Sequence, residues 1–142
     1  MYFKTFSLLF VFGIIACGSV KTKDTSNNTT AQDSIVFGEG GGFTGTVLAW
    51  TLKSNGDIDS LNTWLIPVAK IGNIGPKKAQ EIISEAAKIL PSVPYEKPDN
   101  MYQFIRVYQG DNSGAATFTE RDSAYYRLYQ KLKNVVDGVA VK

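Results

Sequence analysis

Histidine is absent from the 142 residues, and its absence excludes several kinds of chemistry. Ser-His-Asp and Cys-His catalysis need an imidazole as the general base, and histidine-ligated zinc is excluded as well. No pair of carboxylates is singled out by its spacing, as a carboxylate-only hydrolase would require. We therefore expect a protein that is not an enzyme and that has no cofactor and no metal site.

Disulfides and an excess of charge of one sign are also missing. Cys17 is the only cysteine, so the folded domain has to be stable without a disulfide. The 15 basic side chains fall to 14, against 13 acidic ones, once Lys4 is removed with the N-terminal segment. Nucleic-acid-binding domains show a basic excess or a basic stripe, so we expect no nucleic-acid partner.

The longest apolar run is too short to span a bilayer, which takes about 20 residues. It covers residues 6–16 and follows Lys4, an order that is typical of a secretory signal. The run ends in the letters IIAC, with Cys17 last, and this ending resembles the bacterial lipobox. The resemblance implies cleavage before Cys17 and lipid on its sulfur and amine, which would anchor the protein to a membrane. An ordinary buried thiol is the alternative.

The chain therefore divides into a signal peptide over 1–16, a lipidated Cys17 with a disordered tether over 17–33, and a single domain over 34–142. The tether is polar and cannot bury enough apolar surface to fold, and it gives an end-to-end distance on the order of 20 Å. Gly18 and Ser19 follow the cysteine, where the best-known sorting rule would need Asp for retention at the inner membrane. We expect an outer-membrane lipoprotein, and the lack of an acidic run after Cys17 favours the periplasmic face.

The domain is predicted to alternate strands and helices. Periodicity and turn signals predict strands over 34–37, 45–53, 58–71, 101–109 and 115–119, and helices over 76–90 and 119–137. Pro67 should place the third strand at an edge or split it. The expected fold is α+β, an antiparallel sheet of about four to five strands with two helices packed on one face, in the order β-β-β-α-β-β-α.

Aromatic residues recur along the strand over 101–109. Tyr102, Phe104 and Tyr108 stand at even spacing, which places them on one face of a strand. We interpret them, together with Phe118, Tyr125 and Tyr129, as part of the core between sheet and helices, with Tyr126 on the exposed side. A stacking platform for sugars or bases is the alternative.

The stretch GEGGGFTGTV, residues 38–47, contains the pattern G-x-G-x-x-G-x-V. A dinucleotide fingerprint needs a helix directly after the glycines and a Walker A loop needs a lysine, but a strand pattern and Thr46-Val47 stand there instead. A kinase loop would need a far larger domain and an H-R-D motif. We expect no nucleotide; the glycines should let the backbone bend or bulge at a sheet edge, and Phe43 and Thr44 are the candidate partner-binding residues.

The stretch KIGNIGPKKAQEII, residues 70–83, resembles a helix-hairpin-helix module, which grips DNA phosphates. Asn73 stands in the place of the first glycine, and the preceding residues contain Pro67 and many β-branched side chains, which disfavour the first helix. We interpret the stretch as an ordinary helix start.

Three stretches follow one another in the order FGEGGGFTG, KPDNMYQFIRVYQGDNSGAATF and YYRLYQKL. With them, the sequence resembles, over nearly the full mature chain, small envelope lipoproteins of Bacteroidota without assigned function. The pieces Gly41-Gly42-Phe43-Thr44-Gly45 and Pro98-Asp99-Asn100-Met101-Tyr102 are more distantly similar to emfourin-type inhibitors of thermolysin-like metalloproteases, although no inhibitory contact residue transfers. The sequence therefore predicts a lipid-anchored envelope protein with a non-catalytic domain that binds a protein or envelope component. The alternative is an inhibitor of an exported metalloprotease.

Overall fold

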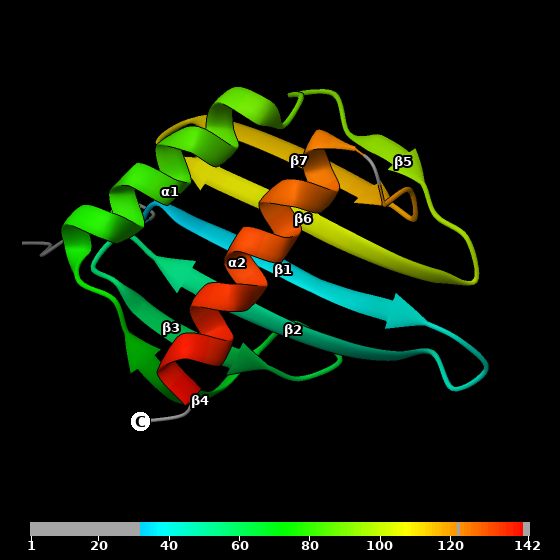
Figure 1. Cartoon of the computed structure of the whole chain (residues 1–142), viewed down its shortest axis with the longest axis horizontal. Helices are drawn as coiled ribbons and strands as arrows, with labels where there is room; N and C mark the ends of the chain where they lie inside the picture. Colours follow the sequence, from blue (N-terminus) through cyan, green and yellow to red (C-terminus); the bar gives the residue numbers. More distant parts are fainter. Residues whose placement is uncertain (1–31, 122, 141–142) are drawn as a thin grey trace, which may run out of the picture.

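A computed structural model describes residues 32–121 and 123–140 (Figure 1). Cys17, the expected signal peptide and nearly all of the expected tether lie outside the described residues. The elements, in chain order, are β1 (Ser34–Gly41), β2 (Thr46–Lys53), β3 (Asp57–Leu61), β4 (Pro67–Asn73), α1 (Pro76–Ile89), β5 (Tyr95–Lys97), β6 (Met101–Gln109), β7 (Asn112–Phe118) and α2 (Ala124–Ala140).

The strands form one mixed sheet of seven strands in the order β4-β3-β2-β1-β6-β7-β5. All neighbours pair antiparallel except β5 and β7, which are parallel. The prediction of about four to five antiparallel strands was therefore wrong, although the fold remains α+β. Two segments account for the difference: the predicted strand over 58–71 contains both β3 and β4, and the proline-rich stretch before residue 101 contains the short β5.

The glycines after Phe37 continue β1 and do not bend it. β1 lies in the middle of the sheet, between β2 and β6, and its pairing with β2 is regular from Ser34 to Gly41. A Cβ at Gly38 would lie 2.5 Å from the carbonyl oxygen of Leu48, so this position requires glycine for close packing. The expected sheet edge was wrong, because β1 is a central strand; the expected positive φ is found at Gly41 (104°) and Gly42 (72°), where the chain turns.

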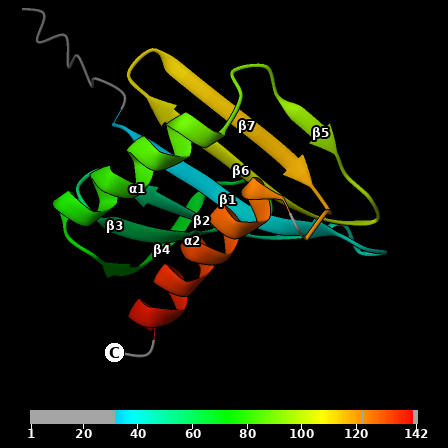
Figure 2. The same ribbon diagram turned by 45° about the horizontal axis from the view of Figure 1, so that its top comes forward.

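Both helices cover one face of the sheet, which Figures 1 and 2 show from two directions. The largest fully buried side chains come from the sheet and from both helices: Ile35, Phe37, Leu52, Ile58, Ile83, Ile105, Phe118 and Leu132. None of the described core residues precedes Ile35. Burial of this apolar surface is the main stabilising term.

The helix ends follow local chemistry. α1 begins at Pro76, where the missing N–H of proline costs nothing, and it ends before Pro91. α2 begins at Ala124, and the backbone N–H of Tyr126 donates to the Ser123 hydroxyl at 3.1 Å. Thr119 and Asp122 have the spacing of a capping box, but the Thr119 hydroxyl accepts the Asp99 N–H at 2.9 Å and does not cap α2; Asp122 lies outside the described residues. Glycine often ends a helix, yet α2 continues through Gly138 to Ala140.

The aromatic side chains of β6 lie on the face that the helices leave open. Phe104 packs in a second apolar cluster with Ala49 and Leu61, and Tyr102 packs against the edge of that cluster. Ile105 and Val107 belong to the core under the helices. The prediction that Tyr102, Phe104 and Tyr108 line the sheet–helix core was wrong, because alternation groups residues by face without telling which face the helices cover.

Neither helix within the described residues combines the length and the apolar composition needed to cross a bilayer.

Candidate functional site

The two ends of the sheet differ. β1 starts beside Asp33, whose backbone oxygen accepts the Ser54 N–H and whose carboxylate accepts the Gly110 N–H, both at 2.9 Å. We call this the near end, because the expected tether joins the domain there. The opposite, far end holds the turn between β1 and β2 and the start of β6, whereas the loop between β3 and β4 lies about halfway along the sheet (Figure 1), because Leu61 pairs with Ala49 and Ala49 with Gly38.

The sequence-predicted pair Phe43 and Thr44 lies at the far end, in the turn of residues 42–45, which we call the hairpin tip. Phe43 is fully exposed, with its whole ring in solvent. The Thr44 hydroxyl lies 2.9 Å from that of Thr46 and is therefore partly satisfied within the turn. The tip presents an apolar ring beside Thr44, with the exposed side chain of Met101 at its base, which is a surface that can bind but has no reactive group.

The base of the hairpin tip is held from the side. The Gly42 N–H donates to the Asn100 carbonyl oxygen at 2.7 Å. A Cβ at Gly41, which has a φ of 104°, would lie 2.0 Å from the same oxygen. The Thr119 hydroxyl in turn donates to the Met101 carbonyl at 3.1 Å. These contacts tie the tip to the start of β6 and pre-organise the position of Phe43.

The face of the sheet without helices has a hollow of about 330 Å³ beside the hairpin. Phe104 is buried at its floor, and the Arg106 guanidinium carbon lies 5.7 Å from the centroid of that ring. Its lining residues are Val47, Leu65, Glu96, Pro98, Tyr102, Phe104, Arg106 and Thr117. Sequence reasoning missed this hollow; the available signal was the alternation along β6, which it assigned to the wrong face.

The loop between β3 and β4 was also missed, because residues 58–71 were interpreted as one strand. The Asn62 side-chain oxygen accepts the N–H groups of Trp64 and Ile66, each at 3.0 Å. Leu65 adopts a φ of 58°, which is rare for a leucine, and its side chain packs on the cluster of Phe104. The loop therefore turns Leu65 inward and leaves Trp64 and Ile66 outside.

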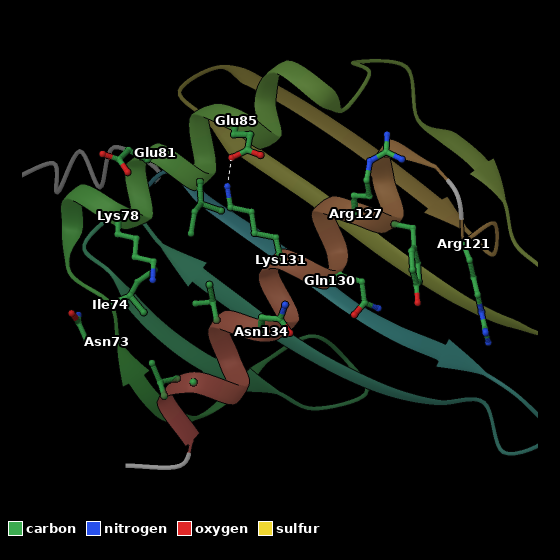
Figure 3. A pocket seen from close by; sticks show the side chains of 15 residues that line it. Asn73, Ile74, Lys78, Glu81, Glu85, Arg121, Arg127, Gln130, Lys131 and Asn134 are labelled. Carbon is green, nitrogen blue, oxygen red and sulfur yellow. Dashed lines mark hydrogen bonds and ion pairs between the residues drawn. The ribbon is translucent and has the colours of Figure 1, made fainter.

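A groove of about 1220 Å³ lies between α1 and α2 (Figure 3). Lys131 of α2 forms an ion pair with Glu85 of α1 across it. Lys78, Glu81, Arg121 and Arg127 also line it, so the described lining has four basic and two acidic side chains. Both signs are present and the groove is bridged by the Glu85–Lys131 pair.

One polar contact ties α2 to the central strand. The Tyr129 phenol donates to the Glu39 carboxylate at 3.1 Å. Burial, with the nearby negative charge of Glu39, raises the pKa of the Tyr129 phenol above its usual range, so it stays a donor. Within residues 32–121 and 123–140, no group of three or more Asp, Glu, Cys or His side chains is placed to hold a metal ion.

The elements next to residues 38–47 and 70–83 show whether these stretches have the surroundings of a nucleotide loop and of a helix-hairpin-helix module. β2 follows the glycine-rich stretch, so no helix N-terminus faces it in the way that a dinucleotide loop requires. β4 precedes the turn at Gly75, where a helix-hairpin-helix module would have its first helix. Residues 76–83 are therefore an ordinary helix start.

A scan against protein-family models gave no match for the chain, and a search of curated proteins gave none either.

Proposed function

We propose that the protein is a lipid-anchored protein of the cell envelope whose domain binds a protein or another envelope component without catalysing a reaction. The observation that carries the proposal is Phe43, a fully exposed aromatic ring on a supported hairpin tip at the end of the sheet far from Asp33. The lipobox-like ending at Cys17 supports the anchor.

Phe43 suits a binding role because its ring is exposed and because the turn that carries it is held in place. Removing a Phe side chain from water contributes roughly 1.5–3 kcal/mol, and aromatic side chains are enriched at protein interfaces. A loop that is already held in place loses less conformational freedom when it binds. The Gly42–Asn100 hydrogen bond of 2.7 Å supplies that support, so most of the burial energy of Phe43 remains available for affinity.

The binding proposal is tested by photo-crosslinking in cells that make the full chain. A photoreactive residue in place of Phe43 should give a discrete adduct with one partner. The same residue in place of Asp111, an exposed position in the turn at the near end, should give none. Phe43→Ala should weaken binding to the captured partner by about tenfold or more. The proposal fails if position 43 gives no adduct or if position 111 gives the same one.

The anchor is tested separately. Cys17→Ser should release the protein from the membrane fraction, since the lipid would be attached to that residue. Continued membrane fractionation of this variant would contradict the lipid anchor and would leave the crosslinking result unaffected.

A second candidate function is inhibition of an exported thermolysin-like metalloprotease by occupation of its substrate cleft. The close approach of Gly41 to Asn100 and the hydrogen bond from Gly42 to Asn100 hold the hairpin tip in place. This favours inhibition, because a loop that fills a protease cleft has to keep its shape in the complex. The mature chain, residues 17–142, should then slow such a protease at micromolar concentration, and Phe43→Ala should remove the effect. No slowing across several thermolysin-like proteases would contradict inhibition.

A further inference from the structure

A second exposed apolar surface lies along the β4 edge of the sheet. Trp64, Ile66 and Val68 are 81%, 57% and 65% exposed, and we call residues 62–68 the Trp64 loop. From Leu61 to Ala69 the sequence LNTWLIPVA contains no charged residue. An exposed, uncharged group of large apolar side chains of this kind marks an interaction surface.

The Trp64 loop has a fixed shape. The Asn62 carbonyl oxygen accepts the Leu65 N–H at 2.8 Å, and the Asn62 N–H donates to the Ile66 carbonyl at 3.0 Å. The Asn62 side-chain oxygen accepts two further backbone N–H groups of the loop. Because these polar groups bond to one another, the loop presents mainly side-chain carbon to its surroundings.

The surface is poorly suited to pairing with the edge of a second copy. β4 begins with Pro67, which lacks a backbone donor, and its pairing with β3 has two register shifts. Lys70 lies in the middle of the strand and pairs with Asp57 at 2.6 Å. Proline, bulges and lysine are the devices by which edge strands avoid pairing with other edges.

We propose that the Trp64 loop docks on the surface of a lipid bilayer, with the indole of Trp64 at the level of the head groups and Ile66 and Val68 inserted beside it. Trp is enriched at the interface between membrane and water, and apolar side chains next to it add binding by burial in the acyl boundary. A protruding, uncharged loop suits a deformable lipid surface.

The lipid anchor of the proposed function would make this contact effective, because a second weak contact gains greatly once a first one holds the protein nearby. The reach is sufficient. The eight residues of β1 extend over about 26 Å, whereas the 16 residues from Gly18 to Asp33 can span at most about 53 Å. The Trp64 loop starts level with the middle of β1, so it can return to the membrane that holds Cys17.

Local charge predicts the lipid dependence. The lysines on this side of the sheet are already paired, Lys70 with Asp57 at 2.6 Å and Lys53 with Asp59 at 2.7 Å. Little net positive charge remains beside the loop. Docking should therefore be similar on zwitterionic and anionic vesicles, in contrast to a polybasic contact.

The experiment uses the single cysteine as a chemical tether. Residues 17–142, which contain the whole described domain, are coupled through Cys17 to phosphatidylcholine vesicles that carry a maleimide lipid. The coupling replaces biological lipidation, so the result does not depend on whether cells lipidate the protein. Trp50 is buried at 6% exposure, so changes in tryptophan emission with vesicles report Trp64.

The expected result is a blue shift of the emission and quenching by brominated phosphatidylcholine. Ile66→Ser with Val68→Ser should lower the quenching to the background of Trp50, whereas Phe43→Ser, which removes an equally exposed aromatic ring, should leave it unchanged. Circular dichroism should show that each variant is folded. The proposal is overturned if the coupled wild-type protein shows no shift and no quenching, if Phe43→Ser abolishes them, or if the shift appears in concentrated protein without vesicles.

Discussion

The hairpin tip and the Trp64 loop both present an exposed aromatic ring, the first at the far end of the sheet and the second beside its β4 edge, and they are built differently. The hairpin tip joins two central strands, depends on glycines and is supported by Asn100. The Trp64 loop includes the first residues of the edge strand β4 and depends on Asn62 and on Leu65 in a left-handed conformation. Trp64 is followed by the exposed Ile66 and Val68, whereas Phe43 lies between Gly42 and Thr44. The same kind of exposed ring is therefore expected to serve a specific partner in one loop and a lipid surface in the other.

The largest expected effect is at the base of the hairpin tip. Gly41→Ala would place a Cβ 2.0 Å from the Asn100 oxygen at a φ of 104°, so it should lower the free energy of unfolding by about 3 kcal/mol. Gly45→Ala is the matched control, since no atom lies within 4 Å of the added Cβ and only backbone strain of about 1 kcal/mol remains. Urea unfolding measures both. Equal losses would show that Asn100 does not support the tip.

The next effect concerns the backbone of the Trp64 loop. Leu65→Ala and Leu65→Gly both remove a side chain that packs over the hollow, and each should cost about 1–2 kcal/mol. Glycine should be the less harmful of the two by roughly 0.5–1 kcal/mol, because the φ of 58° strains alanine and not glycine. Thermal or urea unfolding of the two variants decides this order. A more stable alanine variant would mean that Leu65 is not held in the left-handed conformation.

A smaller effect depends on pH and acts on the edge that carries the Trp64 loop. Hydrogen bonds from Lys70 and Asn73 hold the pKa of the Asp57 carboxyl below its ordinary value of 3.8. A lowered pKa gives stability that is present above 3.8 and is lost as the pH falls through the folded-state value. Asp57→Asn should therefore lower the melting temperature more at pH 7 than at pH 2. An equal decrease at both values would contradict the ionic origin.

The smallest effect is expected for the rings themselves. Phe43→Ala and Trp64→Ala remove side chains that lie almost wholly in solvent, so each should change the free energy of unfolding by less than about 0.5 kcal/mol. Denaturant midpoints that coincide with the wild type would confirm it. If either variant lowered the free energy of unfolding by more than about 1 kcal/mol, the ring would stabilise the folded domain, which contradicts a role in binding alone.

Elements with strong local signals were predictable from the sequence. Pro76 and Pro91 bracket α1, and β-branched and aromatic residues mark β2 and β6. The three-residue β5 was not predictable, because its parallel pairing with β7 depends on tertiary contacts. The face of the sheet on which Phe104 lies was not predictable either, because the alternation of residues along β6 is the same whichever face the helices cover.

The candidate site was predictable only in part. Glycine content pointed to Phe43 and Thr44, but the support from Asn100 comes from residues more than fifty positions away. The Trp64 loop was missed because Trp64, Leu65 and Ile66 resemble a strand in composition. The signals for a turn were present in Asn62 and Pro67, and they were outweighed by the apolar residues between them.

The most direct test of the difference between the two loops is photo-crosslinking from positions 43 and 64 in intact envelopes. A photoreactive residue at position 43 should form an adduct of fixed mass with one partner that is not phospholipid, and at position 64 it should form phospholipid adducts. Mass spectrometry of the two products distinguishes them. Identical products from the two positions, or phospholipid adducts from position 43 alone, would contradict this division of roles.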